Sequence, residues 1–112
     1  MDTLIHKTCV PCQAGAPKLS ESEIQDLKPQ AEGWEVLEKD GEKKLKKEFK
    51  FENYGQSLSF VNNIGNVAEA NGHHPVILFE FRKVTVWWWT HKIGGLHEND
   101  FIMAAKTNHI RV

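Results

Sequence analysis

The fold is decided by residues 53–91, which read NYGQSLSFVNNIGNVAEANGHHPVILFEFRKVTVWWWTH. In the first half of this stretch, from about Asn53 to Asn71, apolar side chains recur at helical spacing. The stripe consists of Tyr54, Leu58, Val61 and Ala68, flanked by Phe60, Ile64 and Val67. Because so wide an apolar face is typical of a helix that covers a core, we expect the main core helix here.

The second half of the stretch changes to the pattern of a β-hairpin. Gly72 is suited to cap the end of the helix, and Pro75 prevents the helix from continuing. Residues 76–81 and 84–91 are rich in β-branched and aromatic side chains, and only two residues separate them. The spacing predicts two antiparallel strands, with His91 at the end of the second.

Another hairpin is predicted before the helix. Asp40 and Gly41 favour the positive backbone angles of a tight turn. A strand over 34–38 precedes the turn, and apolar and charged residues alternate over 45–51 after it.

The two ends of the domain carry helix signals. Ser20 and Glu23 have the spacing of a capping box, and Pro29 ends the short helix that they begin. Near the C-terminus, Glu98 and Asp100 occupy the first turn of a last helix, where the helix dipole favours anions.

The order helix, hairpin, helix, hairpin, helix predicts an α+β fold. We expect a single domain over residues 20–112, in which two hairpins form a four-stranded antiparallel sheet with three helices packed on one face. Residues 1–19 contain two prolines and a glycine but little apolar periodicity, so they predict an irregular N-terminal arm.

Composition narrows the class of protein. The chain has 112 residues and a formal net charge of -1, so it offers no strong field for nucleic acid. Its apolar runs are far shorter than the roughly 20 residues that span a bilayer. Cys9 and Cys12 suit a reducing compartment, and we therefore expect a cytoplasmic protein without a membrane or direct nucleic-acid partner.

Three consecutive tryptophans predict that the last strand is apolar on both faces. Trp87 and Trp89 share one face of the strand, whereas Trp88 points to the other. Since only one face of the sheet is covered by helices, we expect the other to support a homo-oligomer, either a dimer or a tetramer.

A carboxylate and three imidazoles are expected to meet in one cleft. Glu69 lies near the end of the main helix, His73 and His74 follow on the connector, and His91 ends the second hairpin. An imidazole can donate or accept a proton near neutral pH, so one ring can act as an acid while another acts as a base. The set therefore predicts acid–base chemistry.

Metal binding is the alternative for these side chains. Histidine and glutamate are zinc ligands, but the adjacent His73 and His74 lack the spacing of a helical metal pair, and we expect no metal here. In the arm, His6, Cys9 and Cys12 could hold a metal or form a redox pair, although a second ligand pair is missing.

The stretch Glu69-Ala-Asn-Gly-His73-His74-Pro75, followed by Phe81, His91 and Asp100, resembles the signature of the pterin-4a-carbinolamine dehydratase family from about Ser20 onward. The resemblance implies an enzyme that removes water from a 4a-hydroxytetrahydropterin, a product of aromatic amino-acid hydroxylases. The product is a quinonoid dihydropterin, and no cofactor or metal is implied.

The resemblance also implies roles for the site residues. His73 and His91 would serve as general acid and base, and His74 would mainly bind the pterin. Glu69 would orient a histidine and help to bind substrate. Asp100 is expected to cap the last helix, although His97 stands where a serine or threonine would complete the capping box.

Relatives with the same fold imply a different class of function. Animal members bind a transcription factor, and bacterial members are linked to control of hydroxylase expression. A regulatory protein partner is therefore the alternative to catalysis.

Overall fold

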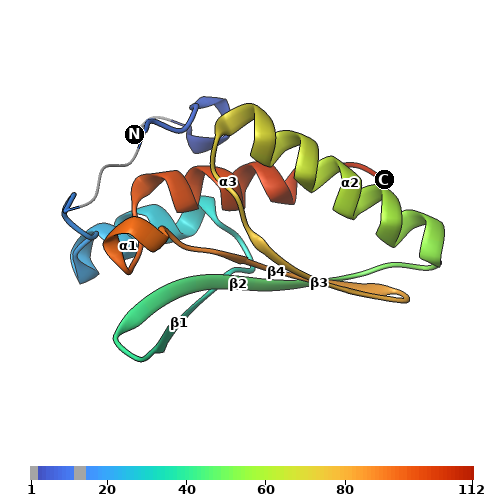
Figure 1. Ribbon diagram of the computed structural model, residues 1–112, viewed down its shortest axis with the longest axis horizontal. Coiled ribbons are helices and arrows are strands. Elements are labelled where there is room, and N and C mark those ends of the chain that lie inside the picture. The colour runs from blue at the N-terminus through green and yellow to red at the C-terminus, as the bar shows by residue number, and fades with distance from the viewer. Residues whose placement is uncertain (1–2, 12–14) are drawn as a thin grey trace.

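The computed structural model describes residues 3–11 and 15–112 and contains one antiparallel sheet covered by helices on one face. The sheet has the order β1-β2-β4-β3, and the helices lie on one side of it in Figure 1. The elements are η1 (Leu4–His6), α1 (Glu21–Leu27), η2 (Lys28–Gln30), β1 (Glu35–Lys39), β2 (Glu42–Lys50), α2 (Tyr54–Asn71), β3 (Val76–Glu80), β4 (Lys83–Trp88), η3 (His91–Ile93) and α3 (Glu98–Asn108). The predicted α+β class and its order of elements are confirmed.

Strand alternation places the core between the sheet and the helices. On β4, Val84, Val86 and Trp88 are fully buried, and Trp88 lies opposite Leu45 of β2. Trp88 also donates from its indole N–H to the hydroxyl of Thr107 in α3, at 3.2 Å. The predicted split of the tryptophans is confirmed, because Trp88 alone of the three is fully buried.

The predicted hairpin turn is confirmed, but the predicted end of the second hairpin is wrong. Asp40 and Gly41 have φ angles of 54° and 80°, the left-handed geometry of a tight turn. By contrast, β4 ends at Trp88, and His91 begins the short helix η3 instead of ending the strand. The chain turns there because Thr90 and Gly95 form a bridge that closes a loop.

Helix α2 has the predicted length but a rotated apolar face. Asn53 caps its start through a 2.9 Å bond from the Gln56 amide, and Gly72 ends it in left-handed geometry. The predicted stripe is wrong at its first two members, since Tyr54 is 49% and Leu58 39% exposed. The side chains that face the core are Ser57, Phe60, Ile64 and Ala68. Ser57 lies among them because its hydroxyl donates to the carbonyl oxygen of Phe81.

The N-terminal arm lies on the body of the domain. Leu4 is 1% exposed and belongs to the core, and its amide donates to the side chain of Gln30 at 2.8 Å. The Lys106 ammonium donates to the carbonyl oxygen of Ile5 at 2.8 Å. The arm is therefore held by apolar contact and by hydrogen bonds to two other parts of the chain.

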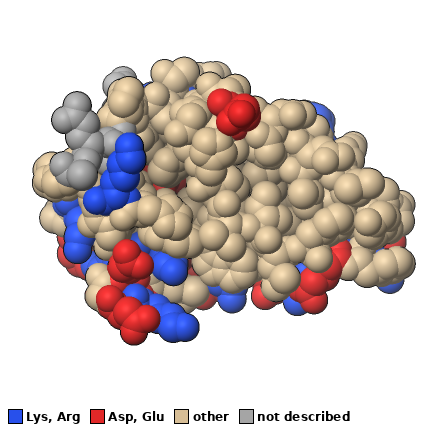
Figure 2. Space-filling model, viewed as in Figure 1, with Lys and Arg blue, Asp and Glu red and all other residues tan. Residues whose placement is uncertain are grey.

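Charged side chains of both signs gather along the lower and left edges of the face shown in Figure 2, while its centre is largely uncharged. No helix within 3–11 and 15–112 has both the length and the apolar character that crossing a bilayer requires.

Candidate active site

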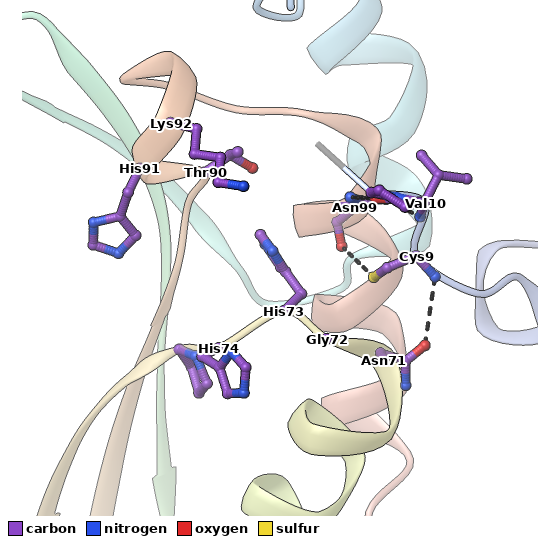
Figure 3. Close-up of a pocket in the computed structure, with 12 residues that line it drawn as sticks. Cys9, Val10, Asn71, Gly72, His73, His74, Thr90, His91, Lys92 and Asn99 are labelled. Carbon is purple, nitrogen blue, oxygen red and sulfur yellow. Dashed lines mark hydrogen bonds between the residues drawn. The ribbon is translucent and has the colours of Figure 1, made fainter. Parts of the chain in front are cut away.

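The three predicted histidines line one pocket, which has a volume of about 540 Å³. It lies where the end of α2, the loop after β4, the start of α3 and the arm meet (Figure 3). Its lining consists of Cys9, Val10, Pro11, Asn71, Gly72, His73, His74, Pro75, Thr90, His91, Lys92 and Asn99.

The end of α2 delivers His73 to this pocket. Gly72 has a φ angle of 63°, a conformation that a glycine adopts without strain. The amide of His73 then bonds back to the carbonyl oxygen of Ala68 at 3.2 Å. The connector is therefore fixed at its first residue, and the ring of His73 projects between the other lining elements (Figure 3).

His73 is held by a buried carboxylate and by an indole ring. Its Nε2 lies 2.6 Å from Oδ1 of Asp100, and its side chain is only 12% exposed. Its ring stacks on Trp88 with centroids 5.7 Å apart. A carboxylate can only accept, so Nε2 carries a proton and Nδ1 is the nitrogen left for a ligand.

Asp100 joins three elements through its two oxygens. One oxygen bonds His73, and the other accepts from the Thr90 hydroxyl and from the His97 amide, both at 2.9 Å. Because its side chain has no exposed area, these bonds replace the water that a buried carboxylate loses. The expected cap is confirmed: His97 takes the place of serine, and its Nδ1 accepts from the Asn99 amide at 3.0 Å.

His74 has a carboxylate partner of the opposite character. Its Nε2 lies 2.9 Å from Oε1 of Glu69, but the side chains are 64% and 82% exposed. Glu69 does not line the pocket and reaches it only through His74. Glu69 therefore contacts a histidine, as the sequence suggested, at the surface of the site.

His91 lies on the other side of His73 from the arm in Figure 3. Its ring contacts the ring of Trp89 with centroids 4.2 Å apart, and the ammonium of Lys44 lies 4.0 Å from the centre of that indole. His91 thus rests on an aromatic side chain that a cation already covers. It has no carboxylate partner in the described part of the chain.

The side chains that could bind a metal do not come together in the described part of the chain. Within residues 3–11 and 15–112, no three side chains of His, Cys, Asp or Glu converge as a metal site would require. His6 is exposed and Cys9 half-buried, and Cys12 lies outside the described residues. Burial, followed by the nearby charge of Asp100, raises the pKa of the Cys9 thiol to about 11.

The sequence did not reveal several residues of the site. Thr90 supports Asp100, and Asn99 bonds the arm, yet neither is distinguished by spacing or residue type. Lys92 lines the rim beside His91. The sequence marked two of these residues only by their position next to predicted site residues. Asn99 precedes Asp100, and Thr90 precedes His91.

The family model described as pterin 4 alpha carbinolamine dehydratase matches residues 17–110 of this chain. The chain belongs to this family. The match contains the pocket's three histidines and the two carboxylates that bond His73 and His74.

Bacterial relatives match almost from end to end. A protein of Nitrosococcus oceani, provisionally named a pterin-4-alpha-carbinolamine dehydratase, is 50% identical over 98% of this chain and 97% of its own length. A protein of Chlorobium limicola with the same provisional name is 50% identical over 96% of this chain and 95% of its own length.

Two solved structures resemble the fold. A transcriptional coactivator/pterin dehydratase from Brucella melitensis is 30% identical, with a TM-score of 0.78 over 86% of this chain and all of its own. A pterin dehydratase-like protein, described as a RuBisCO assembly factor in the alpha-carboxysome, is 25% identical, with a TM-score of 0.60 over 70% of this chain and 89% of its own.

Proposed function

We propose that this protein dehydrates a 4a-hydroxytetrahydropterin to the quinonoid dihydropterin. In this reaction the C4a–O bond breaks, the N5–H bond breaks, and a C4a=N5 double bond forms. One proton must reach the departing hydroxyl, which leaves as water, and one must be taken from N5. The reaction recycles the tetrahydropterin cofactor of aromatic amino-acid hydroxylases.

The observation that carries this proposal is the pairing of His73 with the buried Asp100 at 2.6 Å, inside the pocket that His91 also lines. A carboxylate bonded to Nε2 fixes the tautomer of the ring and stabilises its imidazolium form. His73 can therefore accept a proton at Nδ1 with the resulting charge already compensated. This is the property that a base acting on N5 requires.

His91 supplies the second role. It is exposed at the pocket and has no carboxylate partner in the described chain, so its ring is open to the substrate. We assign the protonation of the 4a-hydroxyl to His91. Because the acid and the base are separate groups, both proton transfers can occur while the substrate is bound once.

His74 and Glu69 bind the substrate in this proposal. The Glu69 carboxylate holds the His74 ring at the pocket, where its other nitrogen can bond the polar edge of the pterin. Because both side chains are largely exposed, their contribution is to affinity more than to the proton transfers.

The proposal is tested by following the loss of freshly generated carbinolamine by stopped-flow absorbance. Wild type should accelerate the loss, while His73→Ala and His91→Ala should each lower kcat by about 100-fold. His74→Ala should mainly raise KM. Wild type that gives no more than the spontaneous rate would overturn the proposal.

Binding of a regulatory protein partner is the second candidate function. It is favoured by the two solved structures, one described as a transcriptional coactivator/pterin dehydratase and the other as a RuBisCO assembly factor. A partner recovered equally by wild type and by the inactive His73→Ala variant would show that binding is separate from catalysis. Failure to recover a partner would remove this candidate.

The proposal also includes self-association and a cytoplasmic location. On β3, which forms one edge of the sheet, Val76 is 42% and Leu78 49% exposed on the face without helices. We infer that a second copy covers this face, in the cytoplasm where the pterin cofactor is used. Sedimentation of wild type and of Leu78→Glu would test this, since the charged variant should be monomeric.

A further inference from the structure

Two neighbouring tryptophans contact the two histidines to which the proton transfers are assigned. Trp88, the last residue of β4, stacks on His73 with ring centroids 5.7 Å apart and ring planes inclined by 14°. Trp89, the residue after it, contacts His91 with centroids 4.2 Å apart and planes inclined by 39°. Because side chains alternate along an extended chain, the two indoles point to opposite faces, and each supports a different histidine.

The backbone of His91 is fixed, but its side chain has few restraints. The Thr90 amide donates to the carbonyl oxygen of Gly95 at 2.9 Å, and the Gly94 amide donates to that of His91 at 3.2 Å. The imidazole is exposed and makes no hydrogen bond within residues 3–11 and 15–112, whereas the other two site histidines each bond a carboxylate. Contact with Trp89 is therefore the restraint on the His91 ring in the described part of the chain.

The indole of Trp89 is itself restrained by a lysine of β2. Leu45 pairs with Trp88 in the register of the sheet, so Lys44 falls beside Trp89 on the face without helices. The Lys44 ammonium lies 4.0 Å from the centre of the indole, where the cation is attracted to the ring. Trp89 is only half-buried, whereas Trp88 is fully buried. A substitution at Trp89 therefore changes a surface contact and leaves the core packed.

Trp87 has similar surroundings without a histidine. It points to the same face of the sheet as Trp89 and is also half-buried. The ammonium of Lys46 lies 5.8 Å from the centre of its ring. No imidazole contacts the Trp87 ring in the described residues. A tryptophan with a lysine over its ring thus occurs twice on this face, once with a site histidine and once without.

We propose that Trp89 is a positioning residue that keeps the His91 ring in the orientation from which it protonates the 4a-hydroxyl. The proposal rests on the proposed function for the role of His91. Trp89 does not line the pocket, so it acts on the reaction through His91 and not on the substrate. A general acid works only within hydrogen-bond reach of the atom that it protonates, and the indole supplies that placement.

Carbinolamine kinetics test the catalytic consequence. Trp89→Leu removes the flat support and should lower kcat about tenfold with KM within about twofold of wild type, because a freely turning ring is seldom in the reactive orientation. Trp89→Phe keeps an aromatic face and should retain kcat within about threefold. Trp87→Leu is the matched control, since it removes a tryptophan from the same face, and it should leave both constants unchanged.

NMR of the His91 ring tests the contact itself, whether or not the protein is active. The ring current of the nearby indole should shift the His91 ring protons upfield, and His91→Gln identifies their signals. Trp89→Leu should abolish this shift and increase the nanosecond mobility of the ring. Trp87→Leu should change neither property, and Trp89→Phe should restore the restricted mobility. If Trp89→Leu is poorly folded, Trp89→Thr replaces it, because a β-branched side chain suits an extended chain.

The outcomes separate the positioning role from the reaction. His91 signals and mobility that stay as in wild type in Trp89→Leu would overturn the proposal, whatever the activity. A freed ring with unchanged kcat, or a fall in kcat that Trp87→Leu shares, would overturn it as well. A freed ring in Trp89→Leu, when wild type does not accelerate dehydration, would support the hold of Trp89 on His91 and overturn the proposed reaction instead.

Discussion

Two neighbouring histidines have the same kind of partner in opposite surroundings. His73 meets Asp100, a carboxylate with no exposed area, whereas His74 meets Glu69, whose side chain is 82% exposed. Both contacts are short, at 2.6 and 2.9 Å. Burial makes the difference, because water screens the surface pair and leaves the buried pair at nearly full strength. Contact between a carboxylate and a histidine is therefore not enough to identify a catalytic pair. The burial of the carboxylate must be considered as well.

The largest effect is expected from breaking the buried pair. Asp100→Asn removes the charge that stabilises the His73 imidazolium and permits the wrong ring tautomer, so kcat should fall by about 100-fold. Stopped-flow kinetics measure the fall, and thermal unfolding shows whether the variant remains folded. A kcat within a few-fold of wild type in a folded variant would contradict the role given to Asp100.

The second effect concerns the support behind the buried carboxylate. Thr90→Val removes the hydroxyl that donates to Asp100 at 2.9 Å, and the free energy of unfolding should fall by about 1–2 kcal/mol. Urea unfolding measures this, with the exposed Thr8→Val as the control. An unchanged midpoint would mean that Thr90 adds nothing to the buried network.

Breaking the exposed pair should have a much smaller effect. Glu69→Gln keeps the shape of the side chain and loses a charge that solvent already screens, so kcat should change by less than about threefold. The same stopped-flow series measures it beside Asp100→Asn. A loss as large as that of Asp100→Asn would mean that burial does not distinguish the two pairs.

The smallest effect on catalysis is expected at Cys9. The reactivity of its thiol is nevertheless sensitive to the charge of Asp100. With its pKa near 11, the Cys9 thiol should alkylate slowly at pH 8 in a Cys12→Ser background. The rate should rise in Asp100→Asn, because the negative charge of Asp100 contributes to the raised pKa. An unchanged rate would place that charge too far away to act.

The same thiol has a consequence for stability. Its pKa is higher in the folded chain than the usual 9.0, so the folded state holds this proton more tightly. Its contribution to stability is full below pH 9 and is lost as the pH rises through about 11. Urea unfolding between these values should show a steeper loss in the Cys12→Ser background than in the variant that also carries Cys9→Ala.

The sequence predicted elements that depend on local chemistry. Asp40 with Gly41 indicated the turn, and Gly72 with Pro75 indicated where the connector to the histidines begins, because these residues restrict the backbone directly. The rotation of α2 was beyond sequence reasoning. Ser57 faces the core only because the carbonyl oxygen of Phe81, distant in sequence, accepts its hydroxyl.

The site was predicted in part for the same reason. Spacing and family resemblance brought the histidines together, but Asp100 was expected only to cap a helix, and its bond to His73 depends on how α3 packs against the end of α2. The arm was predicted as irregular, and nothing in its composition showed that Asn99 would hold it at the pocket.

The central claim is that the pocket built on His73 and Asp100 removes water from a pterin carbinolamine. Its most direct test is the stopped-flow loss of carbinolamine, freshly generated by an aromatic amino-acid hydroxylase, with wild type and His73→Ala at equal concentration. The account predicts acceleration by wild type and a kcat about 100-fold lower for His73→Ala. Equal rates for the two proteins, or no acceleration by wild type, would contradict it.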